Sequence, residues 1–340
     1  MSIFSQCTIK AETSEEMRSI GHSLAQSVDR RDLTILLTGE LGVGKTTFTQ
    51  GFASGLGIKD RVQSPSFALE QRYAGFTHID LYRLSNEQAV AFLAHSQDAI
   101  GIRVIEWAER IDAVSMGPHI HLHLSDSQGT RTITCDFLDE PVPDDAQIDT
   151  WITDVRLPRH IQAHIAAVTR IADTLADALI RSRKSMVRRE ALHAAARTHD
   201  LLRFVDFPSW NGDDLFVPTD LDRAIWKSMR ERYGIPHEQS AARFLGERGF
   251  AAIGEMVRTH RGVEKNGTVS AKTVEQKLLA YSDKRVMFDQ IVSLDERFDD
   301  LIKRYGARQE STDAKQWRAA MKCIETELFP RGAPTSSELE

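Results

Sequence analysis

The stretch GELGVGKTT at 39–47 restricts the possible folds most, because it fits the pattern G-x-x-x-x-G-K-[ST]. It directly follows the apolar run LTILLT and precedes a helical pattern, so it joins a strand to a helix. Glycines in such a turn let backbone amides surround phosphate oxygens, and the helix adds its positive end. Lys45 can reach the terminal phosphates and the Thr46 hydroxyl can hold Mg²⁺. The expected nucleotide-binding residues of this α/β unit are Gly39, Gly42, Gly44, Lys45, Thr46 and Thr47.

Two later apolar runs end in acids. HIDLYRL places Asp80 at the end of one expected strand, and VIEWAER places Glu106 at the end of another. Either carboxylate can bind the metal through water or orient an attacking water, although each is also consistent with an ordinary strand-end acid. Trp107 follows Glu106 and can stack on an adenine or fill the core. The sequence leaves both pairs of alternatives open.

Four segments occur in the order typical of the TsaE family: GELGVGKTTF, SPSFAL at 64–69, HIDLYRL and IEWAER. Residues 5–137 resemble this family of small P-loop ATPases, which assist threonylcarbamoyl modification of tRNA in bacteria. The resemblance implies ATP hydrolysis that resets a partner complex containing the transferase subunits, with only indirect association with tRNA. It also implies that Lys45 binds phosphate, Thr46 and Glu106 bind Mg²⁺, Asp80 is the strand acid, and Trp107 lies by the nucleotide.

The sequence departs from the family pattern at two positions. Ser66 replaces the usual threonine of the SPT segment and keeps a hydroxyl, whereas Ala108 replaces the proline common after Glu-Trp. The family pattern therefore does not define the geometry of the loop after Trp107.

The remainder of the chain changes character after Phe137. The stretch LDEPVPDDAQID is acidic and lacks periodicity, which is typical of a linker, and almost every later segment has helical spacing. We predict an α/β P-loop NTPase domain at 1–138, a linker at 139–156, an all-α domain at 157–330 and a flexible tail at 331–340. Expected helices include one over REALHAAARTHDLLRF and one over 272–289.

Histidines and aspartates of the helical half occur in the order H, HD, H, H, D. Imidazoles and carboxylates from separate helices suit Mg²⁺, Mn²⁺, Fe, Co or Ni. If Asp200 bridges two such metals, one can activate water and the other can stabilise a departing oxygen. The candidate ligands are His164, His199, Asp200, His237, His260 and Asp283.

These segments resemble the HD-domain phosphohydrolases, an all-helical superfamily of metal-dependent enzymes. The segments are AHIAAVTRIA, ARTHDLLRF, PHEQSAARFL, VRTHRG and LLAYSDKRV, which span about 157–290. The resemblance implies a core set of His164, His199, Asp200 and Asp283, with His237 and His260 completing a second metal position. Arg203, where many members carry a lysine, can clamp a phosphate with its planar fork or be a surface residue.

Several other histidines and one basic cluster have simpler interpretations. His160 lies four residues before His164 on one helix face, but His164 continues the apolar stripe and is preferred. His193 is interpreted as supporting structure. The alternating histidines 119, 121 and 123 share one strand face, which we expect to be exposed. RSRKSMVRR at 181–189 is interpreted as a solvated helix end and loop rather than a contact to tRNA.

Charge and composition exclude several classes of protein. The first 140 residues carry 12 basic and 18 acidic residues, and the whole chain has a net charge of −6, so a polycationic nucleic-acid binder is not indicated. No apolar run is long enough to span a membrane, the start lacks a signal-peptide pattern, and three distant cysteines form neither a disulfide framework nor a zinc motif. A cytoplasmic protein without membrane association is expected.

The leading functional hypothesis is an ATPase of tRNA threonylcarbamoyladenosine formation fused to a metal-dependent phosphohydrolase of adenine nucleotides such as ADP or AMP. One alternative makes the helical half a binding or regulatory module that a metal only orders. Another makes the phosphohydrolase the main enzyme, acting on signalling or modified nucleotides, with the P-loop as its ATP sensor.

Overall fold

The computed structural model describes residues 3–28, 32–96, 101–112, 116–210, 216–264, 268–305 and 312–339. The chain forms two compact units. The amino-terminal unit contains Phe4–Glu140 and Ala178–Arg188, and the helical unit consists mainly of Pro141–Asp177 and Arg189–Glu340. An α/β unit followed by a mostly helical one was predicted and is confirmed at this level. None of the helices in the described segments is long and apolar enough to cross a membrane.

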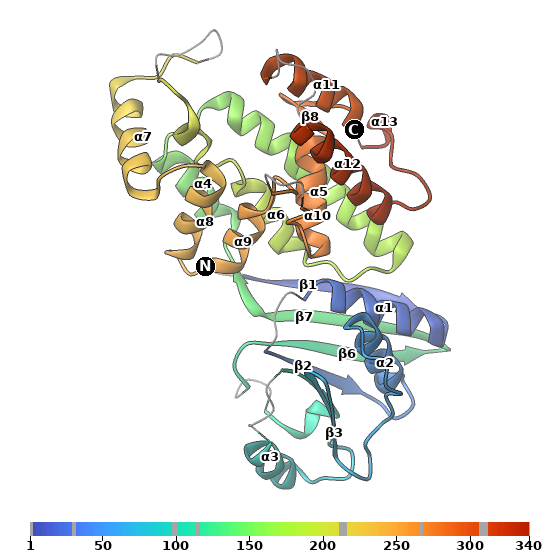
Figure 1. The fold of residues 1–340 in the computed structure, drawn as a ribbon. Helices are drawn as coiled ribbons and strands as arrows, with labels where there is room; N and C mark the ends of the chain where they lie inside the picture. Colours follow the sequence, from blue (N-terminus) through green and yellow to red (C-terminus); the bar gives the residue numbers. More distant parts are fainter. Residues whose placement is uncertain are drawn as a thin grey trace. The chain divides into compact units, whose positions relative to one another are not determined.

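A seven-stranded mixed sheet organises the amino-terminal unit (Figure 1). Its strands are β1 (Ile3–Ala11), β2 (Leu33–Gly39), β3 (Glu70–Tyr73), β4 (Phe76–Asp80), β5 (Ile102–Glu106), β6 (His119–Ser127) and β7 (Thr130–Val142). The spatial order is β1-β7-β6-β2-β5-β4-β3. Because β2, β4 and β5 run parallel, their carboxyl ends meet at one edge of the sheet, where parallel α/β sheets place their ligand sites.

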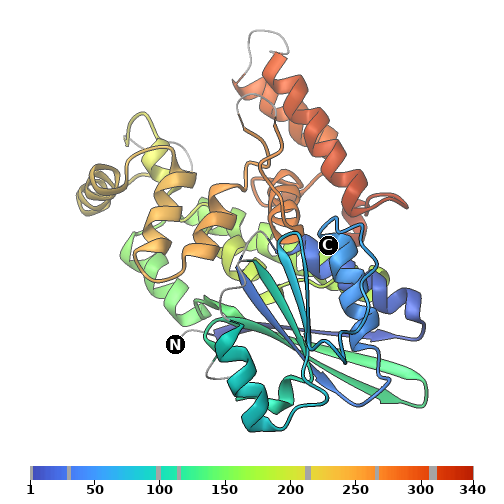
Figure 2. The ribbon, with the colours of Figure 1, turned by 60° about the horizontal axis from the view of Figure 1, so that its bottom comes forward.

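Helices cover both faces of this sheet (Figure 2). They are α1 (Ser14–Gln26), α2 (Lys45–Gly55), α3 (Asn86–His95) and the short 3₁₀ helix η1 (Ala108–Arg110). Side chains alternate between faces along a strand, so Ile35 and Leu37 of β2 join the core under α1 and α2, while Leu36 joins the core under α3 and η1. Gly21 lets α1 and α2 pack closely, since a Cβ there would lie 2.2 Å from the carbonyl oxygen of Phe48.

A segment from far along the chain completes the amino-terminal unit. Helix α5 (Arg159–Arg183) belongs to the helical unit up to Asp177, whereas its last residues and the segment up to Arg188 belong to the amino-terminal unit. Met186 is fully buried in the core of the sheet, and Arg188 is buried with a bidentate ion pair to Asp139. The prediction of a solvated loop at 181–189 was therefore wrong for its second half.

The predicted linker at 139–156 is regular structure. Strand β7 continues to Val142, and α4 (Asp145–Asp154) begins almost at once. Asp144 caps α4 by accepting from the backbone of Gln147, whose side chain bonds back to the backbone of Asp144. One of the acids that suggested a linker, Asp144, therefore serves as the N-cap of a helix.

The helical unit contains most of the remaining helices. They are α6 (Arg189–Thr198), η3 (Arg203–Asp206), α7 (Asp220–Tyr233), α8 (His237–Gly246), α9 (Ala251–Arg258), α10 (Val274–Lys284), α11 (Leu294–Tyr305), α12 (Thr312–Leu328) and α13 (Ser336–Leu339). A two-stranded ribbon of β8 (Val286–Met287) and β9 (Gln290–Ile291) follows α10.

Three predicted boundaries differ from those observed. The helix expected to continue through HDLLRF ends at Thr198, and the helix expected to reach residue 289 ends at Lys284. The tail expected to be flexible carries α13, in which Leu339 is buried. In the first two cases the chain turns beside a candidate metal ligand, so tertiary contacts override helical periodicity there.

Candidate functional sites

The loop between β2 and α2 has the geometry of a phosphate cradle. Gly39 has a φ of 135°, and a Cβ there would lie 2.2 Å from the carbonyl oxygen of Leu124, so no other residue fits. Gly44 has a φ of 113° and caps α2, which begins at Lys45. The free amides at the start of α2 therefore face the same turn that the glycines open. This arrangement can bind a phosphate group.

Lys45, the expected phosphate-binding residue, is buried within this loop. Its Nζ donates to the carbonyl oxygens of Gly39 and Glu40 at 2.6 and 2.9 Å and lies 3.7 Å from the ring centre of Trp107. Burial lowers the pKa of Lys45, which Glu106 partly opposes. The ammonium is thus held at the mouth of the cradle by weak neutral acceptors, which a phosphate can replace.

Glu106 lies at the centre of this site. Its Oε2 accepts from Thr46 Oγ1 at 3.0 Å, and its Oε1 lies 2.8 Å from Nε2 of His78. Thr49 Oγ1 lies 3.5 Å from Oε1 on the same side. A strand-end carboxylate bonded to the P-loop threonine is a suitable ligand set for Mg²⁺. Thr46 and Glu106 are therefore the residues that would hold this ion.

Asp80 is paired in register with Glu106 on the neighbouring strand. Its Oδ2 accepts from Ser64 at 2.5 Å and from Ser66 at 2.7 Å, and its Oδ1 accepts from the backbone of Tyr82. Ser66 thus retains the hydroxyl contact that a threonine would offer. These bonds connect the segment at 64–69 to the strand edge, so both acids border the phosphate loop.

Two further features surround the acids. His78 precedes Asp80 by two residues on β4 and is fully buried, but sequence reasoning missed it although the period-two spacing places both on one face. Trp107 has a φ of 63°, precedes η1, packs against the core under α3 and contacts the ring of Tyr82. It therefore has core contacts and also lies beside Lys45.

The helical unit brings its six predicted ligands together. His164 comes from α5, His237 from the first position of α8 and Asp283 from the end of α10. His199 and Asp200 follow α6, and His260 follows α9. No two neighbouring segments supply all of them, so the cluster forms only when the whole bundle packs.

One side of the cluster is formed by His164, His199 and Asp283. Nε2 of His164 lies 3.1 Å from Oδ1 of Asp283, and Nε2 of His199 lies 3.9 Å from the same oxygen. Nε2 of His199 is also 3.9 Å from Oδ2 of Asp200. Together His164, His199 and Asp200 offer three ligand atoms within 4.8 Å of one another.

The other side shares Asp200 with the first. Nε2 of His237 lies 2.9 Å from Oδ1 of Asp200, and Nε2 of His260 lies 3.9 Å from it. Asp200, His237 and His260 form a second group of three ligand atoms within 4.8 Å. A carboxylate common to two such groups is the arrangement that a bridging ligand requires.

The protonation of the cluster is governed by burial and by its aspartates. Burial first, then His199 and His237, lowers the pKa of His260 to about 3. Burial also lowers the pKa of His237, but bonds and charges from Asp200 and then Asp206 outweigh it and raise this pKa to about 9. The pKa of Asp200 is well below its ordinary value because His199 and His237 outweigh the effect of burial. The carboxylate is therefore ionised and His260 neutral, as metal ligands must be, whereas His237 carries a proton near neutral pH that a metal would have to displace.

Orientation of the histidines supports a fit to metal. The Nδ1 atoms of His199 and His260 lie 2.7 Å from the carbonyl oxygens of Ala196 and Val257, which leaves each Nε2 facing the cluster. Nε2 of His199 is buried and has no hydrogen-bond partner among the described residues. An orphaned imidazole nitrogen between two carboxylates suits a divalent cation. The six residues therefore fit one or two metals.

Arg203 and the unpredicted Asp206 support the second group. NH1 of Arg203 lies 2.9 Å from Nδ1 of His237 and 3.5 Å from Asp206. Asp206 accepts from the backbone of His237 and lies 2.6 Å from Nδ1 of its ring. Arg203 therefore borders the cluster. Asp206 follows Asp200 by only six residues, but nothing in the pattern identified it.

The histidines outside the metal-ligand cluster have other surroundings. The ring centres of His160 and Phe216 lie 6.4 Å apart, and His160 is in none of the three ligand groups found among the described residues. His193 bonds to Asp173 and Asp145, as expected for a structural role. Of the β6 histidines only His123 is exposed, since His119 is buried and His121 is intermediate. The expectation of an exposed strand face was thus wrong for His119.

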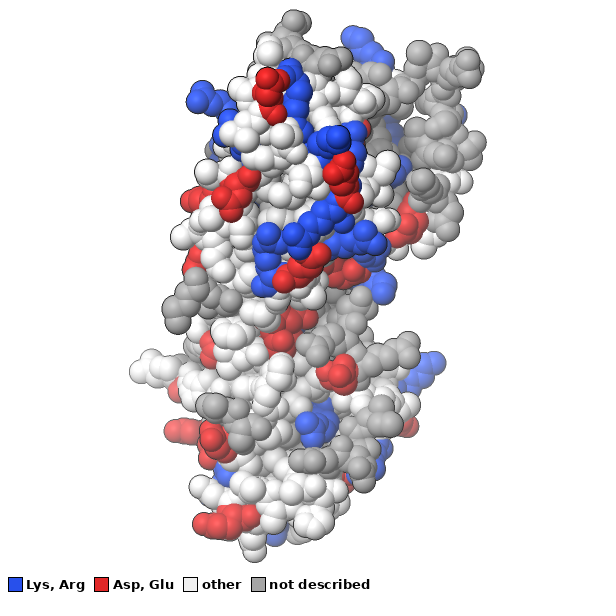
Figure 3. Space-filling model, turned by 90° about the vertical axis from the view of Figure 1, so that its left-hand side faces the viewer, with Lys and Arg blue, Asp and Glu red and all other residues white. Residues whose placement is uncertain are grey.

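Several charged side chains on the surface of the helical unit form ion pairs. Figure 3 shows basic side chains gathered in the upper half of the view with acidic side chains between them. Exposed or half-exposed pairs in this unit include Arg197 with Asp145 and Asp149, and Arg232 with Glu247. Such pairing does not favour a continuous phosphate-binding surface.

Comparison with known proteins identifies the first part of the chain. The family described as "Threonylcarbamoyl adenosine biosynthesis protein TsaE" matches residues 11–133. The "tRNA threonylcarbamoyladenosine biosynthesis protein TsaE" of Bacillus subtilis is 37% identical over 102 residues, which are 29% of this chain and 64% of that protein. The protein of the same name from Streptomyces coelicolor is 36% identical over 104 residues, which are 27% of this chain and 68% of that protein.

A solved structure is similar to part of the chain. The crystal structure of YdiB from Bacillus subtilis is 26% identical, with a TM-score of 0.33, and the match covers 40% of this chain and 88% of that one. The family match ends at residue 133, before the helical unit begins.

Proposed function

The chain belongs to the TsaE family through residues 11–133, and from this premise we propose that its amino-terminal unit hydrolyses ATP with Mg²⁺ in support of tRNA threonylcarbamoyladenosine formation. The pathway is inferred from the names of the relatives. The contact of Thr46 with Glu106 beside Lys45 supports Mg²⁺-dependent hydrolysis of ATP. The unit's partners are then subunits of the threonylcarbamoyl-transferase complex, and its association with tRNA is indirect. It resets that complex and does not itself modify tRNA.

Roles of individual residues follow from their positions. Lys45 exchanges the carbonyl oxygens of Gly39 and Glu40 for the terminal phosphates of ATP. Thr46 and Glu106 hold the ion, and Asp80 orients water from the adjoining strand. Trp107, already against Lys45, borders the nucleotide.

We propose that the helical unit is an HD-type, metal-dependent phosphohydrolase that acts on adenine nucleotides. The observation that carries this proposal is the pair of ligand groups that share Asp200. His164, His199 and Asp283 would hold one position together with Asp200, and His237 and His260 would hold the other with the same Asp200. Divalent metals held there would lower the pKa of a bound water to about 7 and would stabilise a leaving oxygen.

Residues beside the metals bind and orient the substrate. Arg203 presents a planar guanidinium at the edge of the second group and clamps the phosphate. His199 and His237 keep the carboxyl group of Asp200 ionised, so both of its oxygens can act as ligands for the two groups. Fusion gives the second site the first site's product at high effective concentration, since ADP is released within the same chain.

The test is chromatography of ATP incubated with protein supplied with Mg²⁺ and Mn²⁺. Wild type is compared with Lys45→Ala and with Asp200→Ala, because the two variants act on different units. We expect Lys45→Ala to stop formation of ADP. We expect Asp200→Ala to leave ADP formation unchanged and to block further removal of phosphate from ADP or AMP.

Other outcomes separate the competing functions. If Asp200→Ala changes nothing and the purified protein contains no metal, the helical unit is a binding module. If the helical unit is inert on ATP, ADP and AMP with several divalent metals but cleaves another phosphoester, the adenine assignment fails. Stimulation of that cleavage by ATP binding without hydrolysis would make the P-loop a sensor.

A further inference from the structure

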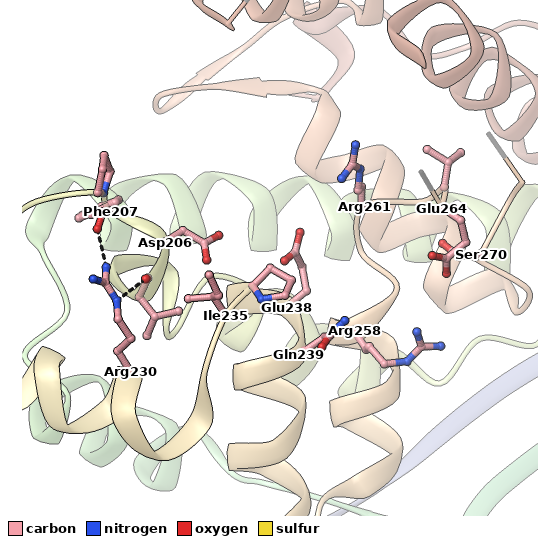
Figure 4. Close-up of a pocket in the computed structure, with 14 residues that line it drawn as sticks. Asp206, Phe207, Arg230, Ile235, Glu238, Gln239, Arg258, Arg261, Glu264 and Ser270 are labelled. Carbon is pink, nitrogen blue, oxygen red and sulfur yellow. Dashed lines mark hydrogen bonds between the residues drawn. The ribbon is translucent and has the colours of Figure 1, made fainter. Parts of the chain in front are cut away.

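A cavity of about 600 Å³ lies beside His237 in the helical unit (Figure 4). Two residues that line it also contact this histidine. Oδ2 of Asp206 is 2.6 Å from Nδ1 of His237, and Oε2 of Glu238 is 3.3 Å from the same atom. The cavity therefore begins where the second ligand group ends. Its volume suits a ligand of nucleotide size.

Three arginines line this cavity, but two of them are already engaged. Arg230 donates to the carbonyl oxygens of Val205 and Phe207, and Arg258 forms a bidentate pair with Glu255. In Figure 4 the guanidinium of Arg258 points away from the space around Asp206 and Glu238. These two arginines therefore have partners within the fold.

Arg261 is the exception among the described arginines of this cavity. Its Nε is buried and has no hydrogen-bond partner in the described structure, while its guanidinium lies 4.9 Å from the ring centre of Trp317. Nε1 of Trp317 also donates to the backbone carbonyl of Arg261. Arg261 directly follows His260, so its backbone is fixed by the same segment that presents a candidate metal ligand.

A buried guanidinium nitrogen without an acceptor is costly, and the acceptor it suits best is a phosphate oxygen. Figure 4 shows the guanidinium of Arg261 across the same space from the carboxylate of Glu238. Oε2 of Glu238 is likewise buried and makes no hydrogen bond in the described part of the chain, and its one described ion-pair contact is with Nδ1 of His237 at 3.3 Å. The cavity is thus lined by a guanidinium that has no ion-pair partner among the described residues and by the carboxylate of Glu238, between apolar walls that include Phe207 and Ile235.

We propose that this cavity binds a second phosphate group of the substrate, separate from the one at the metal-ligand cluster, and that Arg261 is its ligand. The preferred substrates of the helical unit are then nucleotides that carry two phosphates at different positions of the sugar, rather than AMP. The nucleoside between them packs on the apolar walls and donates to Glu238. This inference rests on the proposed phosphohydrolase function and specifies its substrate class.

The test compares AMP with adenosine 3′,5′-bisphosphate on the full chain. Every protein carries Lys45→Ala, so that the phosphate loop of the other unit does not contribute. Binding is measured by calorimetry in EDTA, and phosphate release is measured with Mn²⁺. Arg261→Gln is the test variant, and Arg258→Gln is the matched control because it lines the same cavity with its charge already paired. Thermal unfolding checks that each variant is folded.

We expect the bisphosphate to bind about tenfold more tightly than AMP, because a charge-assisted bond contributes at least 1.4 kcal/mol, about one decade in affinity. Arg261→Gln should abolish this difference and leave AMP binding unchanged, while Arg258→Gln should retain it. Equal binding of the two ligands by the parent protein, or an equal loss of both in Arg261→Gln, would overturn the inference. Absence of phosphate release from either nucleotide would instead refute the phosphohydrolase proposal, whatever the binding shows.

Discussion

Nε2 of His78 lies 2.8 Å from Oε1 of Glu106, and both side chains are buried beside the phosphate loop. The second oxygen of Glu106 accepts from Thr46, so His78 and Thr46 hold the carboxylate from opposite ends. His78 lies on β4 and Glu106 on β5, which fixes the separation of their backbones by strand pairing. We infer that His78 orients Glu106 toward the ion without contacting the nucleotide.

Replacement of His78 by Leu should weaken the use of Mg²⁺ in ATP hydrolysis. Loss of a partner that orients a metal ligand typically costs ~10- to 100-fold in metal affinity or activity. We expect the Mg²⁺ concentration for half-maximal hydrolysis to rise by about that factor. His78→Gln should recover part of the loss, because its amide can reach the same oxygen.

His95→Leu is the control, because this exposed histidine of α3 bonds only to the carbonyl oxygen of Ala91 in the described contacts. It should leave the Mg²⁺ dependence unchanged. A normal Mg²⁺ dependence in His78→Leu, when Glu106→Gln is inactive, would show that Glu106 needs no orienting partner.

Asp206→Asn should selectively weaken one of the two metal positions. Asp206 fixes the ring of His237 through Nδ1 and its backbone through a second bond. An amide oxygen keeps the size but loses the charge, so metal affinity at this position should fall ~10- to 100-fold. Titration of Mn²⁺ into chelator-treated protein should show one unchanged and one weakened event.

The control for this variant is Asp220→Asn, because Asp220 is fully exposed and pairs only with Arg223 among the described contacts. Its Mn²⁺ titration should match that of wild type. Equal weakening of both metal positions in Asp206→Asn would show that Asp206 supports the packing of the unit rather than His237.

The sequence was most informative where local rules act. The P-loop was predicted because the turn at Gly39 and Gly44 needs backbone angles that only glycine adopts easily, and such requirements are visible in sequence. Strand-end acids were also predictable, since Asp80 and Glu106 end apolar runs and parallel strands bring such ends together. The strand and helix content around them follows from the same periodicity.

Long-range packing was not predictable from the same patterns. Arg188 follows a run of basic residues and resembles a surface residue, yet it pairs with Asp139 across 49 positions of sequence. Asp206 resembles any helix-end acid, and its contact with His237 depends on how α8 packs against η3. Both contacts depend on tertiary structure, which the periodicity of one sequence does not predict.

Arg188→Ala should destabilise the amino-terminal unit by about 3 kcal/mol, because it leaves the buried carboxylate of Asp139 without its partner. The neighbouring Arg189→Ala is a close control, since Arg189 is partly exposed in its pair with Asp177 and such pairs contribute less than about 1 kcal/mol. Hydrogen exchange of β7 measures the change locally. Equal protection of β7 in the two variants would contradict a stabilising role of the segment at 178–188.

The pH dependence of the helical unit should contain a contribution from His193. Its Nδ1 lies 2.8 Å from Asp173 and its Nε2 3.3 Å from Asp145. The hydrogen bond with Asp173 is the largest influence and raises the pKa of His193 despite partial burial. Because the folded pKa lies above the unfolded one, the stabilisation is fully present below about pH 6.5 and is lost as pH rises through the raised pKa.

We therefore expect the difference in unfolding temperature between wild type and His193→Asn to shrink as the pH increases from 6 to 9. Measurements in EDTA separate this effect from metal binding, and tryptophan fluorescence reports on the helical unit through residues such as Trp151 and Trp226. Asp173→Asn should remove most of the same pH dependence, because it removes the main partner of the charged imidazole. A difference that stays constant or grows with pH would mean that His193 is uncharged in the folded protein.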